Sequence, residues 1–372
     1  WEEFCGDTLL EKAGWFVEPT ADYVSESPSR SMDFDQEICL NSLRFNYHPV
    51  GSPKGNGLQP PFRTKRLTTR DDISASYTFI LTSAVKKSYE RVLLAASQKW
   101  PVLLCGPSGS GKSALIAKLA EDSGNQVISI QMDDQIDGRT LEGGYVCTDR
   151  PGEFRWQPGS LTQAVQNGFW IVFEDINKAP SDLHSILLPL LEGADSFKTG
   201  HGEVIKVAES FRMFSTIAVS EFDSFESAGQ DALSVLWRRI IIQPPEIKDL
   251  QEIVKARYPD LGLHAGKLIE TFERVNSISM FQIVGFHAEC SSVYCLGRFS
   301  LRDLLKWCKR ITGLGFCFDG SLSEEQCNYI YTEAVDVFAA SPASFDNRLS
   351  IMKEIGNIWK TRGSAAETLY PL

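Results

Sequence analysis

The sequence predicts an α/β domain built on a parallel sheet, followed by a domain made only of helices. The stretch LLCGPSGSGKSALIAKLA contains the spacing G-x-x-x-x-G-K-S, typical of a phosphate-binding loop between a strand and a helix. Short apolar runs then alternate with helical segments as far as Pro244-Pro245, and only helical segments follow. This alternation indicates a parallel sheet that is buried on both faces.

Three regions are expected along the chain. Residues 1–75 are rich in Pro, Ser and Gly and are expected to form an extension that is largely loop, interrupted by one short apolar segment at 38–45. The α/β domain is expected over 76–244 and opens with a helical segment at 79–98. The helical domain is expected over 245–372 and includes the start of a linker.

The expected elements follow from apolar periodicity. The predicted strands of the α/β domain are 102–105, 126–130, 169–173, 211–219 and 238–243. Its predicted helices begin at Ser113 and cover 160–168 and 181–193. The predicted helices of the second domain are 246–258, 265–275, 300–311, 323–340 and 346–360.

Composition excludes several classes of function. A net charge of −11 argues against a general grip on nucleic acid or on an anionic membrane, since both need a basic face. No run of 18 apolar residues occurs, so no transmembrane span is expected. The chain opens at Trp1 rather than Met, so we expect it to be part of a larger unit.

The cysteines are predicted to be reduced thiols. There are nine, none in a CxxC pair, and the odd count without a secretory leader favours the cytosol or nucleus. Cys290 and Cys295 near His287 allow a metal half-site as the alternative. No second half with zinc spacing follows, which favours core thiols.

Residues Gly106 to Ser113 are predicted to bind the phosphates of ATP or ADP. Glycine lets successive N–H groups point inward at phosphate oxygens, Lys112 supplies a positive charge, and the Ser113 hydroxyl is a ligand for Mg²⁺. The alternative is a plain glycine-rich turn. The predicted binding residues are Gly106, Pro107, Ser108, Gly109, Ser110, Gly111, Lys112 and Ser113.

An acid pair follows in FWIVFEDINKAP. Five apolar residues end in Glu174-Asp175, so both acids emerge at the carboxyl end of a buried strand, where ligands of open α/β sheets bind. Hydrolysis beside a phosphate-binding loop needs one acid to orient Mg²⁺ and another group to position the water. The alternative is a solvated turn.

Several stretches together resemble the first AAA+ module of the midasin family, the dynein-related ATPases of large ribosomal subunit assembly. The resemblance covers about residues 75–360, and the first 70 match loosely. MoxR-type relatives share the hairpin pattern GxFxWxPGxL, here Gly152 to Leu161, which the resemblance places toward a ring pore. The alternative is a surface hairpin with Phe154 and Trp156 used for packing. The stretches are IDGRTLEGGYV, GEFRWQPGSLTQAVQNGFWIVFEDINKAP, LLPLLEGADSF, FRMFSTIA and FSLRDLLKWCKR.

The resemblance assigns roles and exposes two departures. Glu174 would help Ser113 hold Mg²⁺ and Asp175 would face the water, although the family usually places Asp before Glu. Ala218 falls where the family offers an asparagine to the water, leaving Thr216 as the only polar neighbour. The resemblance thus predicts a module that binds ATP well and hydrolyses it slowly.

Two arginines complete the predicted site. Arg238 and Arg239 open the last strand, and Arg239 is preferred as the arginine finger that reaches a neighbouring module's γ-phosphate. Surface ion pairing is the alternative for both. Arg302 aligns with the sensor arginine of the lid, and its alternative is an ordinary helix N-terminal arginine paired with Asp303.

The implied function is that of one AAA+ module in a ring with neighbouring modules of the same long chain, acting on pre-60S ribosomal particles in the nucleus, including nucleolus and nucleoplasm. No sequence-specific nucleic-acid or membrane contact is expected. The alternatives are a non-catalytic ring-interaction module and a MoxR-type AAA+ chaperone. A P-loop kinase is disfavoured because the helical domain carries no Arg-rich acceptor lid.

Overall fold

The computed structural model describes residues 65–67, 79–148, 150, 152–218, 235–284, 299–313, 318, 320–340 and 345–359. Most of the expected N-terminal extension lies outside these ranges, including its apolar segment at 38–45. The suggested metal half-site around Cys290 and Cys295 also lies outside the described residues.

A six-stranded sheet forms the centre of the α/β domain, with the strand order β1-β3-β6-β9-β2-β10. Its last five strands are mutually parallel, which confirms the predicted fold class, and β1 adds an antiparallel edge next to β3. The strands are β1 (Lys65–Leu67), β2 (Val102–Gly106), β3 (Val127–Gln131), β6 (Trp170–Glu174), β9 (Arg212–Ala218) and β10 (Arg238–Ile241). β1 falls inside the stretch that was expected to be largely loop.

Helices cover both faces of this sheet, because successive side chains of its buried strands point to opposite sides. Leu104 of β2 packs in one cluster with apolar residues of α3 (Ser83–Ser97) and α4 (Lys112–Ser123). Leu103, one residue earlier, packs in the other cluster with residues of α5 (Gly138–Glu142), α6 (Ser160–Asn167) and α7 (Ser181–Leu191). The alternation explains why β2 reads as a continuous apolar run.

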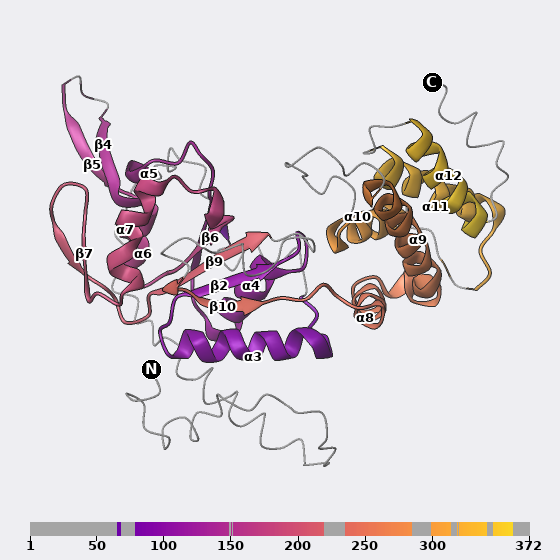
Figure 1. The fold of residues 1–372 in the computed structure, drawn as a ribbon, viewed down its shortest axis with the longest axis horizontal. Coiled ribbons are helices and arrows are strands. Elements are labelled where there is room, and N and C mark those ends of the chain that lie inside the picture. The colour runs from indigo at the N-terminus through magenta and orange to yellow at the C-terminus, as the bar shows by residue number, and fades with distance from the viewer. Residues whose placement is uncertain are drawn as a thin grey trace, which may run out of the picture. The chain divides into compact units, whose positions relative to one another are not determined.

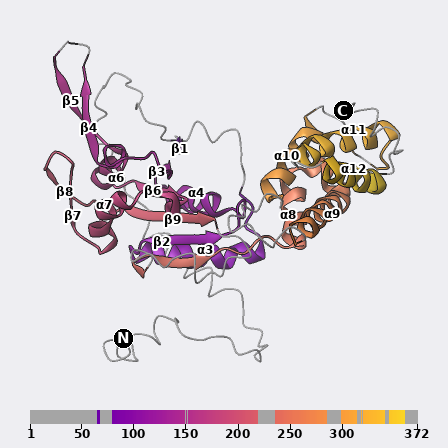
Figure 2. The same ribbon diagram turned by 45° about the horizontal axis from the view of Figure 1, so that its top comes forward.

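Two hairpins extend beyond the sheet as separate two-stranded ribbons (Figures 1 and 2). One pairs β4 (Gly143–Cys147) with β5 (Phe154–Pro158), and the other pairs β7 (Ser196–Lys198) with β8 (Val204–Lys206). The predicted hairpin stretch from Gly152 to Leu161 supplies only the second strand of the first ribbon. Phe154 is exposed, whereas the Trp156 ring packs against His201 at a centroid distance of 4.3 Å, with the ring planes tilted by 51°.

The second domain is helical, as predicted. Its helices are α8 (Ile247–Arg257), η4 (Pro259–His264), α9 (Ala265–Val284), α10 (Leu301–Thr312), α11 (Glu324–Ala334), the π-helical turn η5 (Val335–Ala339) and α12 (Phe345–Trp359). The predicted continuous helix 323–340 therefore ends in a π turn. No described helix is both long and apolar enough to cross a membrane.

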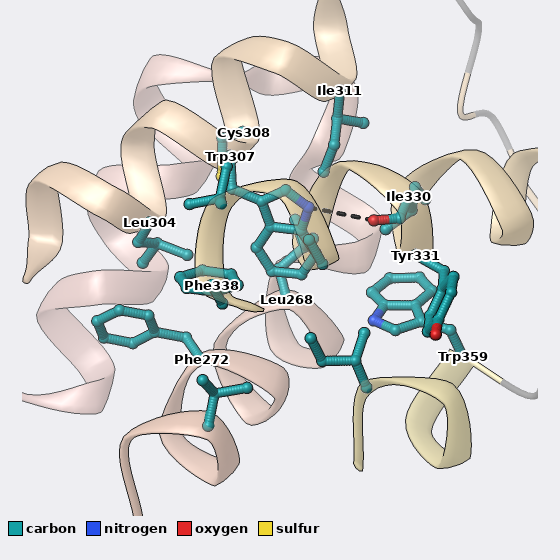
Figure 3. Packing of buried hydrophobic residues seen from close by; sticks show 14 of the residues in the cluster. Leu268, Phe272, Leu304, Trp307, Cys308, Ile311, Ile330, Tyr331, Phe338 and Trp359 are labelled. Carbon is teal, nitrogen blue, oxygen red and sulfur yellow. Dashed lines mark hydrogen bonds between the residues drawn. The ribbon is translucent and has the colours of Figure 1, made fainter. Parts of the chain in front are cut away.

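Aromatic residues from several helices pack among aliphatic side chains in the core of the helical domain (Figure 3). Trp307 of α10 is fully buried, and its ring meets those of Phe338 and Trp359 edge to face at 5.4 Å and 6.2 Å. Its indole N–H donates to the carbonyl of Ile330 at 3.2 Å, so the polar group of this large side chain is satisfied. The domain therefore has a core of its own.

Candidate nucleotide-binding site

The loop between β2 and α4 has the backbone of an anion cradle. Gly109 and Gly111 take φ values of +76° and +91°, a region that residues with a Cβ rarely adopt. Gly106 approaches the residue that follows β10 so closely that a Cβ there would lie 2.3 Å from the carbonyl oxygen of Ile242. α4 begins at Lys112, directly after the loop, and places its positive dipole end there.

Lys112 is folded back over this loop. Its Nζ donates to the carbonyl oxygens of Gly106 and Pro107 at 2.9 Å and 2.7 Å, and the residue is buried. Burial lowers the pKa of Lys112, and the negative charge of Asp175 partly opposes that shift. The ammonium group is therefore shielded from solvent and held by two neutral carbonyl oxygens.

The acid pair lies at the carboxyl end of β6, and its two members have different partners. Glu174 is the last residue of the strand and accepts a hydrogen bond from Ser129 Oγ of β3 at 2.8 Å. Parallel pairing of β3 with β6 places Gln131 beside Glu174. The Glu174 carboxylate is thus tied to the neighbouring strand.

Asp175 leaves the strand in the left-handed region, with φ +55° and ψ +52°. Its Oδ2 accepts hydrogen bonds from Gln131 Nε2 and Lys178 Nζ, each at 3.0 Å. Its own backbone N–H donates to Thr216 Oγ1 at 3.3 Å. Three segments of the chain therefore fix this one residue.

β9 separates the loop from the acid pair. Ala218, its last residue, pairs in register with Gly106, and Thr216 pairs with Leu104. Thr216 is buried, and its hydroxyl oxygen accepts the Asp175 amide, so one of its bonds serves the backbone of the acid. The methyl group of Ala218 offers no hydrogen bond at the strand end nearest the loop.

The residues present fit a magnesium–nucleotide complex. The Ser110 hydroxyl is buried in the loop without a hydrogen-bond partner in the described part of the chain, so it is a polar group that a phosphate oxygen would satisfy. Ser113 in the first turn of α4 and Glu174 at the end of β6 offer hydroxyl and carboxylate oxygens, the donors that Mg²⁺ prefers.

The two arginines of β10 lie on opposite faces of the sheet. Arg238 is exposed, and its guanidinium carbon lies 5.6 Å from the centre of the Trp100 ring. Arg239 is half-buried and pairs with Leu103 of β2. Burial raises the pKa of the Cys105 thiol, and the positive charges of Arg239 and Lys112 oppose that shift, so Arg239 lies on the Cys105 side.

Arg302 is the second residue of α10 in the helical domain and is exposed. Asp303, its possible partner, forms the capping box of this helix. The Asp303 carboxylate accepts from the backbone N–H and the hydroxyl of Ser300, both at 2.9 Å. The Asp303 carboxylate thus forms hydrogen bonds with Ser300 that cap the helix, and it does not need Arg302 as a partner.

Sequence reasoning did not identify three residues of this site. Ser129 and Gln131 belong to a strand that was read only for its apolar residues, and Lys178 follows the acid pair directly. The carboxyl ends of neighbouring parallel strands meet at one edge of the sheet, so a polar residue at the end of a strand beside β6 is a candidate for the site. Such a residue can be chosen only when the order of the strands in the sheet is known.

Two family models match the chain. Residues 101–240 match the AAA domain of the dynein-related subfamily, and residues 249–362 match the midasin AAA lid domain. The chain is 32% identical to midasin of Dictyostelium discoideum over 327 residues, which is 76% of this chain and 5% of that relative. It is 27% identical to midasin of Giardia intestinalis over 245 residues, 64% of this chain and 4% of that relative.

A similarity to shorter proteins also exists. Protein NorQ of Paracoccus denitrificans (strain Pd 1222) is 31% identical over 120 residues, which is 32% of this chain and 44% of NorQ. The lid match and the longer midasin alignments confirm the resemblance that the sequence motifs predict. The chain belongs to the midasin family of dynein-related AAA+ ATPases.

Proposed function

We propose that this chain is a module that binds magnesium–ATP tightly and hydrolyses it slowly. The observation that carries this proposal is the arrangement at one edge of the sheet. A phosphate loop with a buried lysine, a strand-end acid pair and an alanine at the end of β9 lie on three strands that are adjacent in the sheet.

The predicted residues of the loop and of the acid pair each have a role in this proposal. The backbone of Gly106 to Ser113 binds the phosphates, Lys112 neutralises their charge, and Ser113 with Glu174 holds the magnesium ion. Magnesium, when bound, neutralises charge on the phosphates of the nucleotide. Asp175 is the group that faces the attacking water.

Slow hydrolysis follows from the reach of the acid. An aspartate is one methylene shorter than a glutamate, so the Asp175 carboxylate falls about 1.5 Å short of the position that a glutamate would reach. A misplacement of about 1 Å is enough to lower a rate on the order of a hundredfold. Ala218 adds a second loss, because its side chain has no group that holds the water.

The wider context is proposed from the midasin relatives. The chain spans about 5% of the length of such a relative, so we propose that it functions beside other AAA+ modules of one long chain in a ring. The substrate would be the pre-60S ribosomal particle with its assembly factors, in the nucleus. Within the chain, the domain limits would be 1–75, 76–244 and 245–372.

Two other functions have some support. A non-catalytic module that uses bound nucleotide to join ring neighbours is favoured by Ala218 at the sensor position. A MoxR-type chaperone is favoured by the similarity to NorQ, which covers a third of the chain. The midasin-type lid match over residues 249–362 favours the remodelling ATPase over the MoxR-type alternative.

Single-turnover hydrolysis tests the slow-site proposal, using a full-length ring whose other sites are disabled. We expect a rate well below about 1 s⁻¹, the lower end of the usual enzyme range. Asp175→Glu combined with Ala218→Asn should raise it, because the double change restores both reach and a water-holding amide. ATP affinity is the control and should stay within about twofold. A wild-type rate near 1 s⁻¹ would contradict the proposal.

A further inference from the structure

Lys178 contacts Asp175 through both its backbone and its side chain. The backbone N–H of Lys178 donates to the Asp175 carbonyl at 2.9 Å, closing the single 3-10 turn η1 (Ile176–Lys178). The ammonium group of the same residue then reaches back to Asp175 Oδ2 at 3.0 Å. This single turn thus places the ammonium group of Lys178 in contact with the carboxylate of Asp175.

This contact helps to fix a backbone that would otherwise be unfavourable. The left-handed region is unfavourable for a residue with a Cβ, so such a residue persists there only where its surroundings determine its backbone conformation. The bonds from Thr216, Gln131 and Lys178 are the polar contacts that hold Asp175 there.

Both side-chain donors converge on the same carboxylate oxygen. Gln131 Nε2 and Lys178 Nζ each bond to Oδ2, which aims the carboxylate through one oxygen and leaves Oδ1 as the oxygen for a water molecule. The negative charge of Asp175 also raises the pKa of Lys112 against the lowering effect of burial, so the acid and the loop lysine interact electrostatically.

We propose that Lys178 is a positioning residue for hydrolysis: it holds Oδ2 of Asp175 so that Oδ1 is presented to the attacking water. This inference rests on the proposed function, because it requires Asp175 to face that water. The side chain of Lys178 is 58% exposed, so the effect of its ion pair on the Asp175 carboxylate is modest in size.

The test compares nucleotide affinities and therefore does not depend on turnover. The full-length ring, with its other sites disabled, is titrated with ADP and with ADP plus aluminium fluoride, which imitates the transferring phosphoryl group. Lys178→Met should weaken capture of the fluoride complex about three- to tenfold and leave ADP affinity unchanged. Lys178→Arg should restore capture, since it keeps a cation within reach of Oδ2.

The matched control is Lys198→Met, which removes an exposed lysine from β7 and should change neither affinity. Unchanged capture in Lys178→Met, with normal capture in wild type, would overturn the positioning role alone. A parallel loss of ADP affinity would show a general structural defect and also overturn it. Failure of the wild-type site to bind the fluoride complex more tightly than ADP would overturn the proposed function, and the role of Lys178 with it.

Discussion

Lys112 is a buried cation whose Nζ donates to two carbonyl oxygens. Carbonyl oxygens stabilise an ammonium group less than anionic phosphates do, and burial lowers the pKa of Lys112 below its ordinary value of 10.5. Phosphate binding therefore stabilises the protonated form of Lys112 and raises its pKa. Nucleotide binding and protonation of Lys112 favour each other.

ATP affinity should accordingly depend on pH through this one residue. As the pH rises through the lowered pKa of Lys112, free protein loses the proton that the complex retains, so affinity should fall in that window below 10.5. Lys112→Ala should bind ATP at least about tenfold more weakly at neutral pH and show no such fall. Calorimetry of both proteins across that range checks this, and parallel pH curves would contradict it.

At the scale of elements, two helices of the α/β domain end on glycines with similar backbones and different surroundings. α4 ends at Gly124 with φ +71°, and α6 ends at Gly168 with φ +72°. A Cβ on Gly124 would meet nothing within 4 Å, whereas one on Gly168 would lie 1.8 Å from Ser210 Oγ. That hydroxyl donates to the Gly168 carbonyl at 2.7 Å and joins α6 to the segment before β9.

These two glycines form a matched pair for measuring how much the close contact between Gly168 and Ser210 adds to the cost of an alanine. Gly124→Ala should lower the free energy of unfolding by about 1 kcal/mol, the cost of a left-handed alanine. Gly168→Ala should lower it by about 2–4 kcal/mol, because the added methyl also displaces Ser210. Urea unfolding followed by circular dichroism measures both, and equal losses would show that the close approach is relieved without cost.

At the scale of the whole molecule, the edge strand β10 carries the two arginines that are candidates for acting on the nucleotide of a neighbouring module. β10 is the edge strand next to β2, so Arg238 and Arg239 lie at a border of the sheet, pointing to opposite faces. The Trp100 ring below Arg238 already engages that guanidinium. Arg239 is the finger that the sequence pattern prefers.

Removing the two arginines separately tests this assignment. Arg239→Ala should leave ATP affinity at its own module within about twofold and lower hydrolysis at the adjacent module of the ring on the order of a thousandfold. Arg238→Ala is the control and should have little effect on either quantity. A loss of the neighbour's activity in Arg238→Ala alone would assign the finger to that residue instead.

The fold class and the loop were predictable because their signals are local. The apolar runs at 102–105, 169–173 and 211–219 coincide with β2, β6 and β9 to within a residue or two. The apolar pattern that predicts a strand depends only on residues close together in the sequence. The loop follows likewise from glycine and lysine spacing within eight residues. The α11 helix was expected to continue through 340, but it changes to a π turn where Phe338 enters the aromatic core.

The sequence by itself therefore determined the phosphate loop, the acid pair, the sheet-then-helices order and the family. Only the tertiary structure decided how Asp175 is held, because its partners Gln131 and Thr216 lie 44 and 41 residues away and reach it through the order β3-β6-β9. The same holds for β4, which became the partner of β5, and for β1, which became the edge beside β3. Strand order and pairing depend on which apolar faces are buried together, and that choice is made between segments distant in the chain.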